Sequence, residues 1–215
     1  MDAQVERFKA FSTTTISDAL DRLGIAGQAF GVTPLDRAFR LVGRAFTVRT
    51  IPVAKVHGIV GDYIDDVPPG DVVVLDNGGR LDATVWGDIL TIMSHRRGLG
   101  GTVIHGVCRD ATRSLELGYP IFSRGVYMRT GKDRVQADGT NVPVSLGEVR
   151  VEPGDMLVGD ADGVLVVPAG REDEVLGIAQ EITEAEERIR EEIEQGSRLD
   201  EARKRHRYFQ LQSRT

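Results

Sequence analysis

Residues Gly98–Gly118 read GLGGTVIHGVCRDATRSLELG, and their order decides the fold. A glycine turn leads into the apolar segment TVIHG, which is typical of a buried strand, and the segment ATRSLELG after it has the character of a helix. A strand that passes directly into a helix indicates an α/β protein built in layers. Two adjacent opposite charges, Arg109 and Asp110, stand at this junction, where a buried strand has no use for them.

The composition of the chain narrows its class. The 215 residues are 40% hydrophobic, which is enough for one substantial core. The formal net charge of −6 disfavours a nucleic-acid partner, which usually requires a basic face, and 6% aromatic residues leave few rings for base stacking. The 25 glycines indicate tight turns and places where the backbone approaches a ligand.

The first residues, MDAQVERFKAF, lack the apolar core of a secretory signal, and no apolar run approaches the roughly 18 residues of a membrane span. The single cysteine, Cys108, has no partner for an internal disulfide. We expect it to pack in the core rather than act as a nucleophile, because no base is placed to activate it. We therefore expect a cytoplasmic protein without a membrane partner.

Hydrophobic spacing predicts further elements. Residues Phe11–Gly27 predict a short helix that ends near Gly24, and residues Ala38–Val53 alternate as a strand does. Residues Ala83–Gly101 predict a helix that leads through a glycine turn into the strand TVIHG. The apolar side chains at helical spacing in it are Val85, Ile89, Ile92 and Met93.

Two other stretches are built alike. PPGDVVVLDNGG (Pro68–Gly79) and EPGDMLVGDADG (Glu152–Gly163) each combine a Pro-Gly-Asp turn, a short apolar run and a glycine-bearing turn. Each predicts a buried strand that is entered and left by a tight turn, and Gly163–Gly170 completes a hairpin with the second copy. Two short matches predict similar corners of one sheet system and not a solenoid.

From Arg171 the composition becomes more charged, and we expect residues 171–215 to form a helical extension to a first domain of residues 1–170. A long amphipathic helix is predicted first, and the polar segment that ends the chain is expected to be helical in part. The long helix packs one face either on the body of the protein or on a neighbouring subunit. Its apolar stripe is Val175, Ile178, Ile182, Ile189 and Ile193.

The carboxyl end of a strand that runs into a helix is where α/β proteins tend to bind ligands. Arg109 offers a planar fork that can hold a carboxylate through two hydrogen bonds. Asp110, which we expect to point a different way, offers hard oxygen for Mg²⁺ or Mn²⁺. Together they suit an α-keto acid. The alternative is a surface arginine followed by a helix-capping aspartate, since aspartate is favoured at that position.

Asp88 precedes Arg109 by 21 positions, in the segment WGDILT. A strand–turn–helix junction there would expose the backbone amides of Gly87–Leu90, and such amides bind anions and can stabilise an enolate. With these residues in place, the chain resembles the RraA-like / HMG-CHA aldolase family, the 4-hydroxy-4-methyl-2-oxoglutarate aldolases. The likeness covers roughly residues 10–170, and Asp88 followed by Arg109 and Asp110 is its most specific element. Its segments are GDIL, GLGGTVIHGVCRD, YPIFSRG and PGDMLVGDADGVLVVP.

The resemblance implies a three-layer β/β/α fold of the swivelling type, assembled as trimers or hexamers with sites between subunits. It implies a class II aldolase that depends on a divalent metal, Mg²⁺ or Mn²⁺, and cleaves a hydroxy-oxo-acid to pyruvate; oxaloacetate decarboxylation runs through the same enolate. Carried over, Arg109 and Asp88 are catalytic and Asp110 is the metal ligand. The substrate-binding positions are then Gly87, Asp88, Ile89, Leu90 and Arg109.

The chain also departs from the family pattern. Family members often carry an acidic residue two or three positions after the Arg-Asp pair, where this chain has Thr112 and Arg113. The first carboxylate, Glu116, is expected to be a poor substitute because it lies on another part of the helix. His105 stands where the family often has Asp or Asn, and we expect a strand histidine that is hydrogen-bonded within the subunit. These changes leave the substrate and the strength of metal binding open.

Two other functions fit parts of the sequence. The resemblance extends to non-catalytic regulators that bind RNA-degradation machinery, but a binding module has no need of a metal-binding carboxylate at Asp110. A methyltransferase of quinone biosynthesis is disfavoured, because the chain has no strand–GxGxxG–helix unit followed by an acidic residue.

Overall fold

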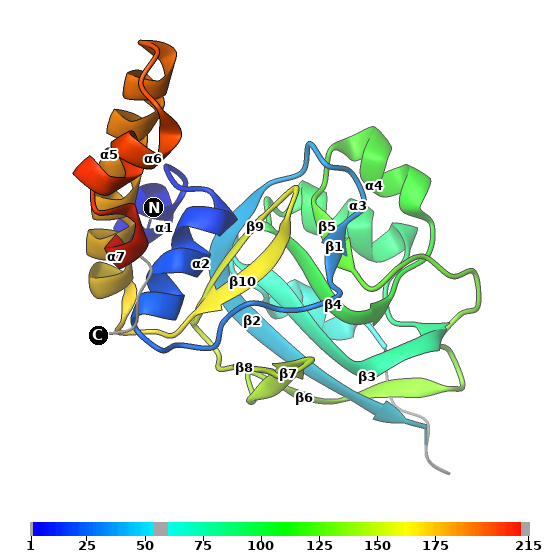
Figure 1. The fold of residues 1–215 in the computed structure, drawn as a ribbon. Coiled ribbons are helices and arrows are strands. Elements are labelled where there is room, and N and C mark those ends of the chain that lie inside the picture. Colours follow the sequence, from blue (N-terminus) through cyan, green and yellow to red (C-terminus); the bar gives the residue numbers. More distant parts are fainter. Residues whose placement is uncertain (1, 54–59, 212–215) are drawn as a thin grey trace.

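The computed structural model describes residues 2–53 and 60–211 and has the α/β architecture that the sequence predicts (Figure 1). The main sheet has the strand order β1-β5-β4-β3-β2-β9-β10, and β6 pairs with β2. Strands β2 to β5 are parallel, and the other pairings of this sheet are antiparallel. Its strands are β1 (Thr33–Pro34), β2 (Leu41–Pro52), β3 (Val72–Thr84), β4 (Gly101–Val107), β5 (Ile121–Ser123), β6 (Val135–Thr140), β9 (Met156–Asp160) and β10 (Gly163–Val167).

Short helices connect the parallel strands. α3 (Asp88–Arg96) joins β3 to β4, and α4 (Ala111–Leu117) joins β4 to β5, so the strand and helix predicted within Gly98–Gly118 are both present. The remaining elements are α1 (Ala3–Phe8), α2 (Thr13–Arg22), the 3-10 helix η1 (Asp62–Asp66), the separate hairpin of β7 (Val144–Leu146) and β8 (Val149–Val151), α5 (Glu172–Glu194), α6 (Leu199–Arg205) and α7 (Tyr208–Leu211).

The apolar run of β3 is buried on both faces of the sheet. Val72 and Val74 lie in one core with the β7–β8 hairpin and the β9–β10 pair, whereas Val73 and Leu75 lie in a second core with η1 and α3. Because successive strand residues point to opposite faces, a strand covered on both sides needs apolar residues without alternation. The resulting layers have the β/β/α order that the resemblance implies.

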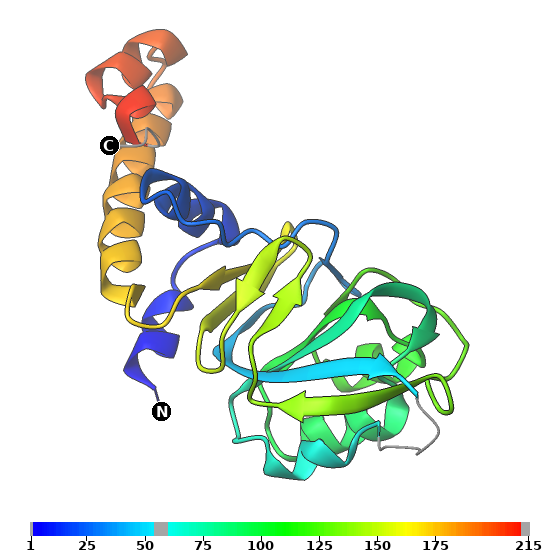
Figure 2. The ribbon, with the colours of Figure 1, turned by 90° about the horizontal axis from the view of Figure 1, so that it is seen from below.

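A third core lies between the outer face of β9–β10 and helices α1, α2 and α5. The long helix predicted after Arg171 is present as α5, and its Val175 and Ile182 are fully buried in this core. The first half of α5 therefore packs on the body of the protein. Figure 2 shows the helix leading away from the sheet, with α6 beside its far half, and Ile193 near the end of α5 is 41% exposed. α7 folds back along α5, and its Leu211 packs against the third core.

The prediction for β3 is wrong at its end. The strand does not stop at the Asp-Asn-Gly-Gly segment but continues to Thr84. Gly78 and Gly79 adopt left-handed backbone angles, with φ of 59° and 68°, and the register with β4 shifts there. The glycines thus form an irregularity within a strand and not a turn that ends it. The second copy of the pattern does form the predicted hairpin, as β9 and β10.

The prediction for α3 is also wrong in part. The helix begins only at Asp88, so Val85 lies before it in the buried connection from β3. Ile89 and Ile92 are 76% and 45% exposed, whereas Met93 packs against the second core, so only part of the apolar stripe faces the core. The helix also buries Thr91 and Ser94. Within residues 2–53 and 60–211, no helix combines the length and the apolar character needed to cross a membrane.

Candidate active site

The connection from β3 to α3 and the connection from β4 to α4 meet at one edge of the sheet, because β3 and β4 are parallel neighbours. The backbone amide of Arg109 donates to the carbonyl oxygen of Trp86 at 3.0 Å and joins the two connections. Arg109 and Asp110 follow β4, and Asp88 begins α3. The structure therefore brings the three predicted site residues together.

The Asp110 carboxylate does not cap its own helix. Its backbone is left-handed, with φ of 56°, and no side-chain cap bond is made to α4. Its Oδ2 atom instead accepts a hydrogen bond from the Asp88 amide at 3.2 Å and lies 3.3 Å from Arg109 Nε. The capping alternative is therefore wrong, and so is the expectation that Asp110 points away from Arg109.

Gly87 makes this approach possible. An added Cβ atom there would lie 2.9 Å from Asp110 Oδ2 and 3.2 Å from Arg109 Nε. The backbone of Gly87 is extended, so its requirement for glycine is one of space and not of conformation. Gly87 was predicted as an amide donor. The structure adds a second role: the absence of a side chain at Gly87 leaves space for the Asp110 carboxylate.

The first turn of α3 presents backbone amides at the same place. Gly87 occupies the N-cap position without a side chain to cap the helix, and the Asp88 amide is satisfied by Asp110. Within the described parts of the chain, the amides of Ile89 and Leu90 have no hydrogen-bond acceptor. These two N–H groups and the helix dipole favour an anion at this helix start.

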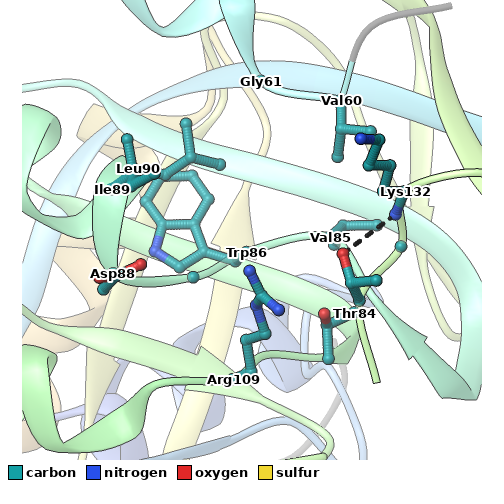
Figure 3. A pocket seen from close by; sticks show the side chains of 13 residues that line it. Val60, Gly61, Thr84, Val85, Trp86, Asp88, Ile89, Leu90, Arg109 and Lys132 are labelled. Atoms are coloured by element: carbon teal, nitrogen blue, oxygen red, sulfur yellow. Dashed lines mark hydrogen bonds between the residues drawn. The ribbon is translucent and has the colours of Figure 1, made fainter. Parts of the chain in front are cut away.

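A pocket of about 240 Å³ opens beside these groups. It is lined by the stretch from Thr84 to Leu90, by Val60 and Gly61, by Arg109, and by residues 130–132. Figure 3 shows the Arg109 side chain reaching into the pocket, with Asp88 at one end of the view and Lys132 at the other. Asp110 does not line the pocket itself. It contacts two groups that do, the Arg109 side chain and the Asp88 amide.

Trp86 forms a fixed wall of this pocket. Its ring is 2% exposed and stacks on Tyr119 with a centroid separation of 6.4 Å, and burial raises the pKa of the Tyr119 hydroxyl to about 12. The indole Nε1 donates to Thr91 Oγ1 at 2.9 Å. Sequence reasoning missed Trp86 and the lining residues around position 131. The only local signal for Trp86 was its place just before the Gly-Asp pair of α3.

Asp110 fits a divalent cation as a single protein ligand. Its Oδ1 atom has no hydrogen-bond partner among the described residues, and its side chain is 41% exposed. No cluster of three or more His, Cys, Asp or Glu suited to a metal occurs in residues 2–53 and 60–211. Mg²⁺ commonly takes one or two carboxylates and completes its shell with water and substrate oxygens, so one carboxylate is enough.

The residues that depart from the family pattern have structural partners. Glu116 forms an ion pair with Arg113, one turn earlier in α4, at 2.7 Å. Its carboxylate is therefore paired within the helix and does not replace the acidic residue of the family pattern. The Nδ1 atom of His105 lies 3.3 Å from Asp76 Oδ1, which confirms a strand histidine bonded within the subunit. Burial raises the pKa of the Cys108 thiol, and the side chain is fully buried, in agreement with a packing role.

The fold and the site define an α/β protein with a pocket at the carboxyl ends of parallel strands, lined by the start of α3 and by Arg109. Comparison with known proteins gives the family: the profile described as "RraA-like: Aldolase/RraA" matches residues 13–166, and the chain belongs to this family. The chain is 36% identical to a protein of Halalkalibacterium halodurans named "Putative 4-hydroxy-4-methyl-2-oxoglutarate aldolase". The alignment spans 187 residues and covers 87% of this chain and 86% of that protein.

Two further relatives widen the comparison. Protein DlpA of Legionella pneumophila is 40% identical over 203 residues, which are 93% of this chain but 33% of DlpA, so the chain spans about a third of that relative's length. The structure of Streptomyces coelicolor RraAS2, described as an unusual member of the RNase ES inhibitor RraA protein family, superposes with a TM-score of 0.80 at 31% identity. The superposition covers 86% of this chain and 96% of RraAS2.

Proposed function

We propose that the protein is a divalent-metal-dependent lyase that cleaves a hydroxy-oxo-acid of the HMG/CHA type, or oxaloacetate, and releases pyruvate. One observation carries the proposal: Asp110 Oδ2 lies 3.2 Å from the Asp88 amide and 3.3 Å from Arg109 Nε, at the edge of the pocket. A carboxylate, a guanidinium and a helix start thus converge where an oxo-acid fits. The aldolase name of the Halalkalibacterium halodurans relative supports the same class of enzyme.

The groups of the pocket have separate tasks in this proposal. The carboxylate of the α-keto acid binds the amides of Ile89 and Leu90, because the start of α3 favours an anion. The Arg109 guanidinium donates to the keto oxygen, where negative charge develops as the C3–C4 bond breaks. Asp110 holds Mg²⁺ or Mn²⁺, and the ion, when bound, adds further stabilisation to that charge.

The proposed reaction conserves atoms and electrons for both substrates. In the hydroxy-oxo-acid, the C4 hydroxyl loses its proton and its oxygen forms a C=O bond to C4, so the C4 fragment leaves as a second oxo-acid. The C3–C4 bond breaks, and its electron pair enters the enolate of pyruvate. In oxaloacetate the C4 carboxylate leaves as CO₂, and the same enolate forms. The enolate takes a proton at C3 in each case: the proton removed from the C4 hydroxyl in the first reaction, and a proton from water in the second. Asp88, the carboxylate that lines the pocket, is the proposed proton acceptor.

We further propose that the chain assembles as a trimer or hexamer in the cytoplasm and that another copy covers the pocket. Apolar side chains on α3, on α4 and after β5 support this assembly: Ile89 is 76% exposed, Leu115 is 46% exposed and Met128 is 76% exposed. Exposed apolar residues on neighbouring elements are typical of protein–protein contacts. Sedimentation velocity at micromolar concentration tests the assembly, and a monomer would contradict it.

The proposed activity is tested by coupled pyruvate release from 4-hydroxy-4-methyl-2-oxoglutarate and from oxaloacetate, with Mg²⁺ or Mn²⁺ and with a chelator. We expect release that depends on the metal. Because oxaloacetate also decarboxylates without a protein, its rate is compared with that of Asp110→Asn at the same metal concentration. No release above this background from either compound would contradict the proposal.

The second candidate function is a regulator of RNA degradation. The likeness to RraAS2 favours it, since RraAS2 is described as a member of an RNase ES inhibitor family. Inhibition of RNase ES by the chain, together with no pyruvate release, would replace the lyase with this function.

A further inference from the structure

Among the described residues that line the pocket, Lys132 is the one charged residue that the proposed bond cleavage does not use. Asp88 and Arg109 are the other two charged lining residues among the described parts of the chain. Figure 3 shows Lys132 beside Val60, at the end of the view opposite Asp88 and Ile89, with Arg109 between them. The pocket thus offers positive charge at a distance from the start of α3, where the α-keto acid end is proposed to bind.

The loop that carries Lys132 is fixed to the end of β3. Both the amide and the hydroxyl of Thr84 donate to the Arg129 carbonyl, at 3.1 Å and 3.0 Å. Gly131 packs so closely that an added Cβ atom would lie 2.1 Å from the Thr84 carbonyl oxygen. Because the Arg129 carbonyl is bonded to Thr84 and Gly131 packs against the Thr84 backbone, Lys132 is held beside the pocket.

The turn itself is also well determined. The Lys132 amide donates to Thr130 Oγ1 at 3.2 Å, and Arg134 Nη1 donates to the carbonyls of Thr130 and Lys132, each at 3.3 Å. Asp133 has a left-handed backbone, with φ of 62°. A non-glycine residue rarely adopts that conformation unless its surroundings require it. The turn therefore sets where the Lys132 side chain starts.

The Lys132 ammonium is available to a ligand. Within residues 2–53 and 60–211, no hydrogen bond or ion pair engages its Nζ atom, whereas Arg109 already contacts Asp110. A lysine ammonium is a compact charge on a flexible stem, so it can receive a carboxylate without the fixed geometry that a guanidinium requires. This suits a substituent that varies in position between substrates.

We infer that Lys132 is the specificity-determining residue of this pocket and that its ammonium receives a second carboxylate of the substrate, one that lies away from the α-keto acid group. The inference rests on the proposed function for the orientation of the substrate. It excludes oxo-monoacids as preferred ligands, because they leave Lys132 without an anion. Thr130 and Gly131 act only by positioning the lysine.

The test compares two oxo-acids of equal chain length that lack the 4-hydroxyl group and are therefore not cleaved. 2-Oxoglutarate has a second carboxylate, and 2-oxopentanoate has a methyl group in its place. Calorimetric titration with Mg²⁺ present gives the ratio of their dissociation constants for the wild type, for Lys132→Gln, and for Lys204→Gln as a control that removes the same charge from α6.

We expect Lys132→Gln to weaken 2-oxoglutarate binding at least 10-fold while 2-oxopentanoate binding stays within about twofold, and Lys132→Arg to restore most of the loss. Lys204→Gln should change neither constant. An unchanged ratio in Lys132→Gln, an equal loss for both ligands, or a wild type that does not prefer 2-oxoglutarate would overturn the inference. Failure of the proposed lyase function would appear separately, as absent pyruvate release by the wild type.

Discussion

Two acid–base pairs stand on or just after β3 and β4, and only one of them opens onto the pocket. Asp76 of β3 and His105 of β4 have side chains 18% and 14% exposed, whereas Asp110 and Arg109 after β4 are 41% and 40% exposed. Asp76 accepts bonds from the Gly78 amide at 2.9 Å and from the Ser145 amide at 3.0 Å, besides its contact with His105.

The difference lies in how the carboxylate oxygens are used. Both Asp76 oxygens are occupied by backbone amides, so this carboxylate connects β3 to the β7–β8 hairpin and the glycine irregularity. Only one Asp110 oxygen has a partner among the described residues. A carboxylate whose oxygens are all satisfied stabilises the fold, whereas a carboxylate with an oxygen left over can bind a ligand. Four substitutions test this distinction.

The largest effect is expected from Asp110→Asn. The amide keeps the shape of the side chain and removes the charge that holds a hard cation, so metal-dependent turnover should fall by roughly 100-fold or more. The melting temperature should stay close to that of the wild type, and Asp200→Asn on α6 is the matched control. Wild-type turnover by Asp110→Asn at limiting Mg²⁺ would show that Asp110 is not the ligand.

Gly87→Ala should follow, although it removes no functional group. The added methyl group would lie 2.9 Å from Asp110 Oδ2, so the carboxylate must move away from the start of α3. A displacement of about 1 Å at a catalytic group can lower the rate by roughly 100-fold, and we expect a loss of 10- to 100-fold in kcat. Gly177→Ala on α5, where the methyl group meets nothing within 4 Å, is the control. Equal rates for the two variants would mean that the close approach at Gly87 does not matter.

Arg109→Lys should have a smaller effect on turnover. The variant keeps the positive charge but loses the planar fork, and its contact with the developing negative charge weakens. We expect kcat to fall by at least ~10-fold, which corresponds to about 1.4 kcal/mol, with little change in metal affinity. The reverse pattern, a normal kcat with weakened metal binding, would make Arg109 a structural partner of Asp110 only.

Asp76→Ala should change stability and leave turnover within about twofold. Removal of the carboxylate leaves the amides of Gly78 and Ser145 without their acceptor, which typically costs about 1–3 kcal/mol. Urea unfolding measures the loss, and Asp138→Ala, which breaks the more exposed pair with Arg49, should cost at most about 1 kcal/mol. A larger effect of Asp76→Ala on kcat than on stability would remove the distinction between the two pairs.

The sequence predicts well those parts of the site that lie within one segment of the chain, and poorly those that depend on contacts between distant segments. The strand and helix around Arg109 follow from hydrophobic spacing within Gly98–Gly118. The junction expected around Gly87–Leu90 is present at the start of α3, although spacing alone predicted an earlier start of that helix. The orientation of Asp110 does not follow, because a left-handed residue after a strand has no distinct sequence signal. An aspartate at the start of a helix is expected to cap it, and here the space at Gly87 directs it to another helix.

The far wall of the pocket depends on pairing between distant segments. Lys132 comes close to Arg109 only because the loop around Gly131 bonds to Thr84, some forty-five residues earlier in the chain. The end of β3 was missed for a related reason: the Gly78–Gly79 segment has the composition of a turn, and only its neighbours β4 and β7 show that the strand continues. Both features are tertiary, and local periodicity does not contain them.

The central claim is that the pocket stabilises a pyruvate enolate with the help of a divalent cation at Asp110. Loss of the pyruvate methyl signal by proton NMR in deuterium oxide measures enolate formation directly, without any C–C cleavage. We predict that the protein with Mg²⁺ accelerates this exchange, and that a chelator or Asp110→Asn abolishes the acceleration. Exchange no faster than in protein-free Mg²⁺ solution, or an acceleration that persists in the chelator, would contradict the account.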